Sequence, residues 1–181
     1  TASVLVEVQQ APLDFNLIDT NIIIGEELVL DAFAGEGFTY QWTPSEGLSC
    51  DDCPRPRAQP LSSVEYQVLV KDQTGCFEFR KDIFIEVKEI FTLDVPTAFS
   101  PNGDGVNDVI FARGAGLKAL IAFKIYNRFG ELVFESNDFD RGWDGTYRGQ
   151  DQNIETYIYT VEALTFSNRI LTKKGNISLL R

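Results

Sequence analysis

The sequence contains no histidine among its 181 residues. Histidine is the commonest general base and the commonest zinc ligand in enzymes, so its absence excludes a Ser-His-Asp or Cys-His enzyme. Catalysis by carboxylates alone needs two acids held across a cleft at a set separation. The acidic pairs Glu26–Glu27 and Asp51–Asp52 lie in predicted turns or at predicted strand starts. We therefore expect no enzymatic activity.

Basic residues are also few. There are 16 Lys and Arg against 27 Asp and Glu, which gives a formal net charge of −11. Binding to nucleic acid relies on a basic face, so we expect no nucleic-acid partner. Hydrophobic residues make up 44% of the chain and aromatic residues 12%, which is enough to bury real cores.

Long apolar runs are missing. No stretch approaches the roughly 20 apolar residues of a membrane helix, so we expect a chain that does not span a membrane. An initiator methionine and a signal-peptide core are absent too. We expect a monomeric piece of a longer protein. Residues 1–10 read either as the closing strand of a preceding module or as an ordinary first strand.

The three cysteines are Cys50, Cys53 and Cys76. A single C-x-x-C without histidine is not a zinc site, and this one lies in a proline-rich loop rather than at the start of a helix. In an exported protein, Cys50 and Cys53 would close a small disulfide ring. Reduced thiols, or pairing of either residue with Cys76, are the alternatives.

Apolar and polar residues alternate through most of the chain, and helical periodicity is nearly absent. In the first half the alternating runs are separated by turn-forming residues, which predicts an antiparallel sandwich. These runs are residues 27–32, 38–42, 65–72 and 82–89.

The second half repeats this style with a different sequence. Residues 120–134 predict a hairpin in which Gly130 takes the left-handed conformation. Residues 156–166 and 169–174 predict another hairpin, followed by a separate short strand at 176–181. We place the boundary near Glu89–Asp94. The expected fold is all-β, with two consecutive Ig-like antiparallel β-sandwich domains at residues 1–90 and 91–181.

Oxygen-bearing side chains gather between two apolar runs in "TAFSPNGDGVNDVIF". Hard cations such as calcium bind six to eight such oxygens, so this loop is a candidate calcium site. The alternative is a structural turn in which Asx side chains accept bonds from neighbouring backbone N–H groups. The candidate ligands are Asn102, Asp104, Asn107 and Asp108, with Asp144 from "GWDGT" as a further carboxylate.

Trp143 of the same "GWDG" motif has two readings. An exposed tryptophan stacks on sugars, whereas a buried one fills the core beneath its loop. We favour the core, with Asp144 accepting bonds from the amides that follow it.

A set of marks recurs through the first half of the chain: Tyr40, Trp42, Pro44, Gly47, Leu48, Ser49, Cys50, Cys53, Pro54, Tyr66, Val68, Val70, Gly75 and Cys76. With these residues the first half resembles the PKD-like, Ig-like modules of Bacteroidetes cell-surface proteins. The resemblance implies a spacer or an adhesion stalk.

Four motifs follow one another in the second half: "TAFSPNGDGVNDVI", "FKIYNRFGELVFES", "GWDGTYRG" and "KKGNISLLR". In this order they resemble the gliding motility-associated C-terminal domain, the type B sorting domain of the type IX secretion system. The resemblance covers nearly all of residues 94–181. There is one departure, because the family usually has a glycine turn ahead of its Tyr-x-Tyr strand. Here Glu155 and Thr156 must form that turn.

The resemblance implies an export signal that the type IX machinery recognises, generally with an outer-membrane partner of the PorP/SprF type. The cargo would be a large surface or secreted protein, typically an adhesin linked to gliding motility. It would pass through the periplasm to the cell surface or the medium. The alternative is a calcium-dependent adhesion or carbohydrate-binding module.

Candidate contacts to this machinery are the cations Arg128, Lys173, Lys174 and Arg181. Neighbours on a strand point to opposite faces, so Lys173 and Lys174 do not share one patch. The structural alternative for Arg128, at the hairpin corner, is pairing with a carboxylate across the sheet. For the tail cations it is that they are solvated charges that discourage edge-to-edge association.

Overall fold

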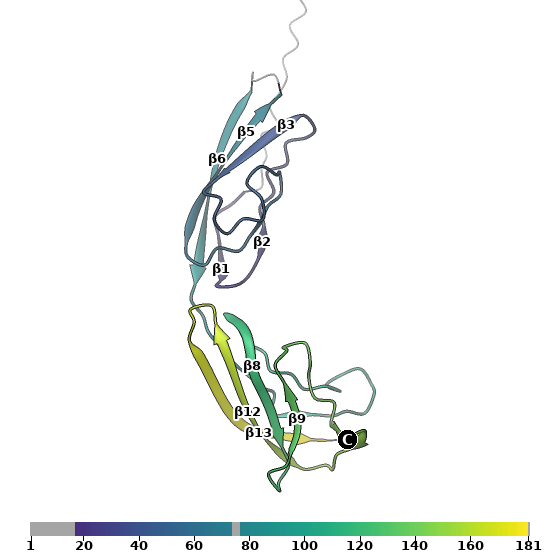
Figure 1. Ribbon diagram of the computed structural model, residues 1–181. Helices are drawn as coiled ribbons and strands as arrows, with labels where there is room; N and C mark the ends of the chain where they lie inside the picture. Colours follow the sequence, from purple (N-terminus) through teal and green to yellow (C-terminus); the bar gives the residue numbers. More distant parts are fainter. Residues whose placement is uncertain (1–16, 74–76, 181) are drawn as a thin grey trace, which may run out of the picture. The chain divides into compact units, whose positions relative to one another are not determined.

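A computed structural model describes residues 17–73 and 77–180 of the chain (Figure 1). Every regular element in this part is a β-strand, so it offers no helix of the length and apolarity that crossing a membrane requires. The backbone forms two compact units. The N-terminal unit ends at Lys88, and the C-terminal unit begins at Glu89 and also takes in Ile23–Gly25. The predicted all-β sandwich fold is confirmed.

The N-terminal unit is built on a sheet of four strands in the order β1-β6-β5-β3. A second, smaller sheet pairs β2 with β4. Alternate residues of the larger sheet, such as Trp42 and Val68, are buried against Leu30 and Ala58 of the opposite layer. The strands are β1 (Thr20–Ile23), β2 (Leu28–Val29), β3 (Phe38–Thr43), β4 (Arg57–Ala58), β5 (Val64–Asp72) and β6 (Glu78–Lys88).

Strand β2 is shorter than the alternating run at 27–32 predicts. Beyond it, the amides of Leu30 and Ala32 still donate hydrogen bonds, to the carbonyls of Pro56 (3.0 Å) and Pro54 (2.9 Å). Proline has no N–H to return, so the pairing runs in one direction only and no regular ladder forms. The two side chains are nevertheless buried, as the alternation predicts.

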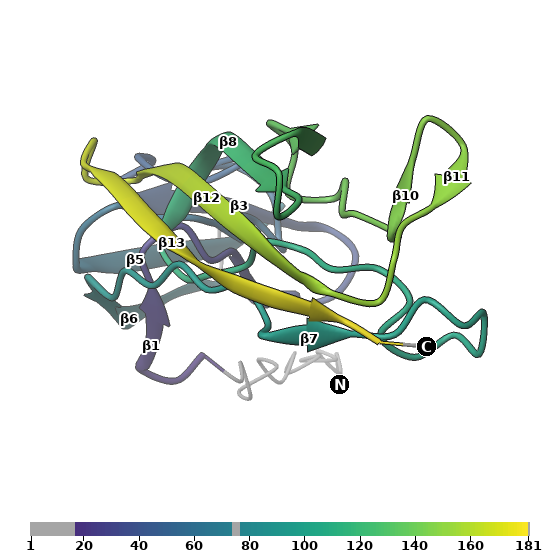
Figure 2. The ribbon, with the colours of Figure 1, turned by 90° about the horizontal axis from the view of Figure 1, so that it is seen from below.

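The C-terminal unit is built on a sheet of five strands in the order β7-β13-β12-β8-β9. Figure 2 shows β12 and β13 running side by side through its middle, with the small β10–β11 hairpin beyond their end. Strand β7 pairs parallel to β13, and the other pairs are antiparallel. The strands are β7 (Ala98–Phe99), β8 (Leu117–Tyr126), β9 (Leu132–Ser136), β10 (Thr146–Tyr147), β11 (Gln150–Asp151), β12 (Thr156–Thr165) and β13 (Ile170–Leu179).

One face of this sheet carries the core. Phe123 and Ile125 of β8, together with Tyr157 and Val161 of β12, are completely buried. Segments outside the sheet cover this face with apolar residues of their own, which completes the sandwich. The covering residues in the same core are Leu93, Val95, Ile110, Ala112 and Trp143.

The last strand differs from its prediction. We expected separate strands at 169–174 and 176–181, but β13 runs without a break from Ile170 to Leu179. Gly175 lies directly opposite Tyr159 in the ladder. A Cβ at Gly175 would come within 2.9 Å of the tyrosine ring, so glycine here makes room for an aromatic side chain rather than ending the strand.

Both predicted hairpins of this unit are present. Gly130 has a φ of 78°, as expected for its turn. The β10–β11 hairpin was not predicted. Its turn places Arg148 at φ 53° and Gly149 at φ 75°, and two consecutive positive φ angles are the mark of a tight hairpin turn.

Candidate functional site

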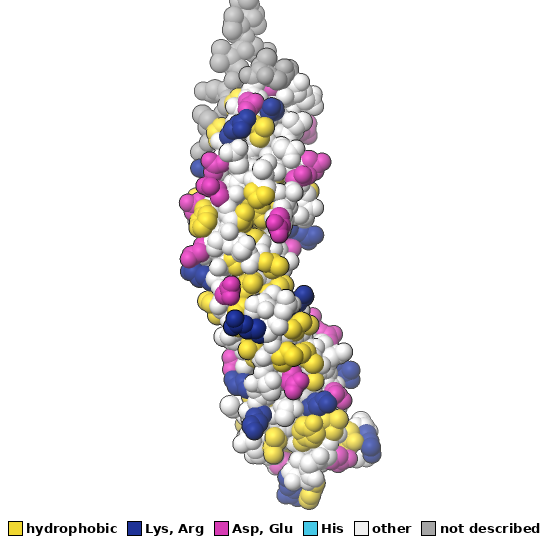
Figure 3. Space-filling model, turned by 60° about the vertical axis from the view of Figure 1, so that its left-hand side comes forward, with side chains coloured by type: hydrophobic (Ala, Val, Ile, Leu, Met, Phe, Trp, Pro, Cys, Tyr) yellow, Lys and Arg dark blue, Asp and Glu magenta, His cyan; other side chains and the backbone are white. Residues whose placement is uncertain are grey.

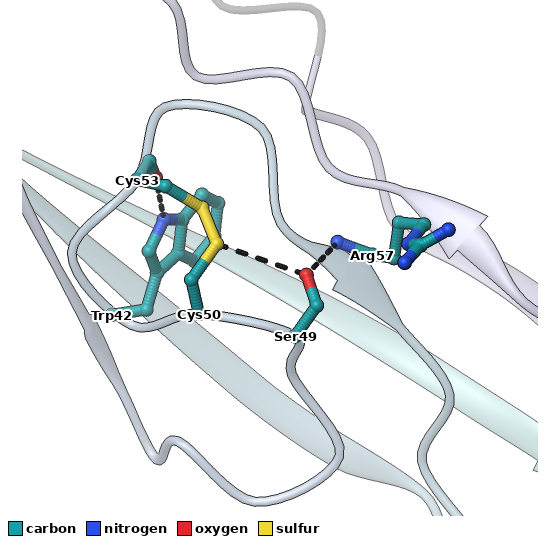
Figure 4. The surroundings of a disulfide bond; sticks show 5 residues. All are labelled: Trp42, Ser49, Cys50, Cys53 and Arg57. Atoms are coloured by element: carbon teal, nitrogen blue, oxygen red, sulfur yellow. Dashed lines mark hydrogen bonds between the residues drawn. A yellow bond between two sulfur atoms is a disulfide. The ribbon is translucent and has the colours of Figure 1, made fainter.

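The cysteine loop of the N-terminal unit closes over its buried tryptophan (Figure 4). Cys50 and Cys53 form a disulfide. The indole Nε1 of Trp42 donates to the Cys53 carbonyl at 2.9 Å, and the Trp42 amide donates to the Asp51 carbonyl at 2.7 Å. These two hydrogen bonds from Trp42 therefore fix the disulfide loop against the core. Cys76, the alternative partner, lies outside the described residues.

The loop that follows β7 is organised by one carboxylate. Asp108 accepts hydrogen bonds from the backbone amides of Asn102 (2.9 Å), Gly103 (2.8 Å) and Gly105 (2.8 Å). The amides of Gly103 and Gly105, with a smaller contribution from Asn102, hold the pKa of Asp108 below its ordinary value. Its ionised form is thus part of the loop's structure.

The other candidate calcium ligands of this loop also bond within it. Asp104 accepts from the Val106 amide and from the Asn102 side chain, while Asn102 Oδ1 accepts from the Asp104 amide. Asn107 has a φ of 56°, a left-handed conformation that asparagine tolerates well. These are the hydrogen bonds that we expect if the loop is a structural turn.

Asp144 lies on a separate segment, where it accepts from the Thr146 amide (2.9 Å) and hydroxyl (2.8 Å). Within residues 17–73 and 77–180, no group of three or more acidic or cysteine side chains is placed to hold a metal ion. Calcium binding by Asn102, Asp104, Asn107, Asp108 and Asp144 stays a prediction.

Trp143 is a core residue, with only 1% of its surface exposed. Its Nε1 donates to the Thr146 carbonyl at 2.8 Å. Its ring packs against those of Phe99 and Tyr157, with centroids 5.3 and 4.8 Å away. The buried position favours the interpretation that Trp143 is a core residue, because a ring that stacks on a sugar must be accessible.

The candidate recognition cations are spread over the C-terminal unit. Arg128, in the β8–β9 turn, lies 3.5 Å from Glu155 and over the Phe129 ring. Lys173 pairs with Asp94, whose hydrogen bond and negative charge hold the pKa of Lys173 above its ordinary value. Lys174 is exposed, opposite Thr160 in the ladder.

Lys173 and Lys174 thus point to opposite faces, as the strand geometry predicts, and Arg181 lies outside the described residues. On the face drawn in Figure 3, basic, acidic and hydrophobic side chains are interspersed rather than gathered by type. The cations therefore do not form one basic patch.

Sequence reasoning missed a groove beside β9. It has a volume of about 590 Å³ and is lined by aromatic and arginine side chains, among them Phe111, Phe134, Arg141, Tyr147 and Arg148. The sequence offered only a weak signal, because Arg113 and Arg148 closely follow Phe111 and Tyr147, whereas Arg141 comes near Phe134 only in the fold. Arg113 stacks on Phe111 at 4.5 Å, Arg148 on Tyr147 at 4.8 Å, and Arg141 on Phe134 at 6.0 Å.

The chain is similar to several solved structures, although the likeness is loose. A chimeric titin Z1Z2 carrying a peptide from decorin is 16% identical, with a TM-score of 0.48; the match covers 97% of this chain and 100% of that one. Fibronectin(III)-like modules of Clostridium thermocellum CbhA are 12% identical, with a TM-score of 0.32 and 94% of each chain covered. No curated protein sequence matches the chain significantly.

The family comparison is more specific. The family model described as the CHU_C type IX secretion signal domain matches residues 93–179. This segment lies inside the C-terminal unit and runs from Leu93 of its core to Leu179 at the end of β13. It contains the first three of the four motifs in full and the fourth as far as Leu179. Over residues 93–179, the C-terminal unit of this chain is similar to the type IX secretion signal domain family.

Proposed function

We propose that residues 91–181 are the signal that directs export of a large surface or secreted protein, in transit through the periplasm, across the outer membrane. We propose that residues 1–90 are an Ig-like spacer. The observation that carries the proposal is the family match over residues 93–179. A type IX secretion signal interacts with the secretion machinery and directs export to the cell surface or the extracellular space. The cargo we propose is an adhesin linked to gliding motility.

The partner we propose is an outer-membrane protein of the PorP/SprF type. Its contacts would be the accessible cations Arg128 and Lys174, together with Lys173 and Arg181. The distribution of these side chains suits a partner that reads a folded surface rather than a short linear tag. We propose a binding role without catalysis for both units.

The last strand supports the view that the signal is a folded domain. Ile177 and Leu179 are 0% and 1% exposed, and β13 lies between β7 and β12. Deleting Asn176–Arg181 therefore removes core residues as well as any end signal. Such a deletion tests whether the folded unit is needed, and surface substitutions must test recognition.

The export experiment uses the whole 181-residue chain. A reporter with an N-terminal periplasmic export signal is fused ahead of the chain and expressed in a type IX-competent host and in an isogenic host without the machinery. We expect the reporter at the surface or in the medium of the first host only. Retention in the periplasm of the competent host, or export without the machinery, would contradict the proposal.

The recognition residues are tested by charge reversal. Arg128→Glu combined with Lys174→Glu should reduce export several-fold while the thermal transitions of the purified chain persist. The matched control is the pair Lys118→Glu and Arg169→Glu, which makes the same change of charge at other exposed cations of the C-terminal unit. Equal loss of export in both pairs would assign the effect to overall charge.

A further inference from the structure

The groove beside β9 follows the edge of a sheet. Its wall includes three consecutive residues of β9, Val133, Phe134 and Glu135. Because consecutive strand residues point to opposite faces, a groove that contacts all three runs along the edge of the strand. On its other side the groove is lined by residues of the segment 140–148.

Strand β9 is the last strand of its sheet, paired only with β8 within the five-stranded ladder. The strand at the opposite end, β7, has only two residues. An edge strand offers backbone N–H and C=O groups to an incoming extended segment. Among the described strands of this unit, β9 therefore presents the longer terminal edge.

The acidic side chains of the groove are already engaged. Glu135 pairs with Lys124 at 3.2 Å, and Asp140 pairs with Arg113 at 3.6 Å. Asp144 accepts both hydrogen bonds from Thr146. With the two partner cations included, the groove and its rim carry four basic side chains and three acidic ones, which is a small positive excess.

Arg141 and Arg148 are different. Both are exposed, and neither guanidinium has a carboxylate partner within the described part of the chain. The Arg148 guanidinium stacks on Tyr147 at 4.8 Å, and the Arg141 guanidinium lies farther from Phe134, at 6.0 Å from the ring centroid. Both rings are half-buried and pack against the core. A stacked guanidinium still presents its edge N–H groups, which match the geometry of a carboxylate.

The turn at Arg148 supports a role for this side chain. Its φ of 53° is a left-handed conformation, which glycine and asparagine adopt more readily than arginine. Folding alone would therefore favour another residue at this position. Outliers of this kind gather at binding sites.

We propose that the groove beside β9 binds an extended acidic segment of a partner protein. The backbone of the segment extends the sheet at β9. Its alternate apolar side chains lie on Phe111, Phe134 and Tyr147, and its carboxylates pair with Arg141 and Arg148. This binding mode concerns the groove alone and is independent of the proposed export function.

The test uses the 181-residue chain and a blocked, fluorescently labelled octapeptide of alternating glutamate and leucine. We expect saturable binding by fluorescence anisotropy, and no binding of the matched lysine–leucine peptide. The double variant Arg141→Glu, Arg148→Glu should weaken binding about tenfold or more. The control pair Lys118→Glu, Arg169→Glu, which lies outside the groove, should bind as the unsubstituted chain does.

A second peptide tests the extension of the sheet. N-methylation of alternate residues removes the N–H groups that would bond to β9 and should abolish binding, while the unmodified peptide should slow amide hydrogen exchange in β9. Three results would each overturn the proposal: no binding of the acidic peptide at about 1 mM, equal binding of the lysine peptide, or equal weakening in the control pair.

Discussion

Each unit buries one tryptophan beneath a loop, yet the two loops are held by different chemistry. In the N-terminal unit, Trp42 lies under a loop closed by the Cys50–Cys53 disulfide. In the C-terminal unit, Trp143 lies under a loop in which the Asp144 carboxylate accepts two hydrogen bonds. In both, the indole N–H donates to a carbonyl of its own loop, at 2.9 and 2.8 Å.

This difference shows that a loop over a buried tryptophan can be held either by a covalent bond or by charge-assisted hydrogen bonds. A reductant breaks the first and leaves the second intact. The neighbouring loop of the C-terminal unit follows the second pattern, because Asp108 gathers three backbone amides. The two units should therefore lose their loops under different conditions.

The units also differ in charge. Residues 1–88 contain 15 acidic and six basic residues, whereas residues 89–181 contain 12 acidic and ten basic residues. Nearly all of the net charge of −11 thus lies in the first part. An acidic partner would be repelled by the N-terminal unit and far less by the C-terminal one, in keeping with the groove beside β9.

The largest expected effect is the loss of either tryptophan. Trp42→Ala and Trp143→Ala should each destabilise their own unit by about 3–5 kcal/mol, since each removes a fully buried aromatic side chain. Calorimetry should show one transition lowered and the other kept. Since these are the chain's two tryptophans, the fluorescence that is left in each variant reports on the other unit. A shift of both transitions by either variant would mean that the units do not unfold separately.

Opening the disulfide should have a smaller effect. The double variant Cys50→Ser, Cys53→Ser should destabilise the N-terminal unit by about 2 kcal/mol, because the ring closed by the bond is short and constrains the unfolded chain little. Thermal melting should show the C-terminal transition unchanged. Cys76→Ser is the matched control, and an equal effect of this variant would argue against the Cys50–Cys53 ring as the cause.

Protonation of Asp108 should have the smallest effect. Its pKa is lowered in the folded state by the amides that bond to it, so its contribution is full above the unfolded value and is lost as pH falls through the folded one. The window lies below about pH 4. Hydrogen exchange should show the amides of Asn102, Gly103 and Gly105 exposed there, and Asp108→Asn should remove this dependence. Unchanged protection at low pH would contradict it.

Much of the fold follows from particular residues. The alternation around Trp42, Tyr66 and Val68 predicts a strand face, and all three are buried. The hairpin at Gly130 follows from its need for positive φ. The continuous strand β13 was not predictable, because Gly175 looks like a strand end until Tyr159 is seen opposite it.

The candidate site was less accessible to sequence reasoning. The sequence identifies the Asx-rich loop, because its Asn and Asp residues are close together. The sequence does not determine whether their side-chain oxygens face an ion or the backbone amides of the loop. The groove beside β9 was missed because Phe111, Phe134 and Tyr147 come from three segments. Their arginine partners become visible as stacked pairs only in three dimensions.

The sequence by itself determined the all-β class, the positions of most strands and the resemblance to a sorting domain, because side-chain alternation and turn residues act locally. The tertiary structure alone decided which strands lie at the edge, which carboxylates are engaged and which arginines keep a free guanidinium edge. Those properties depend on neighbours that are distant in the chain, and packing brings them together.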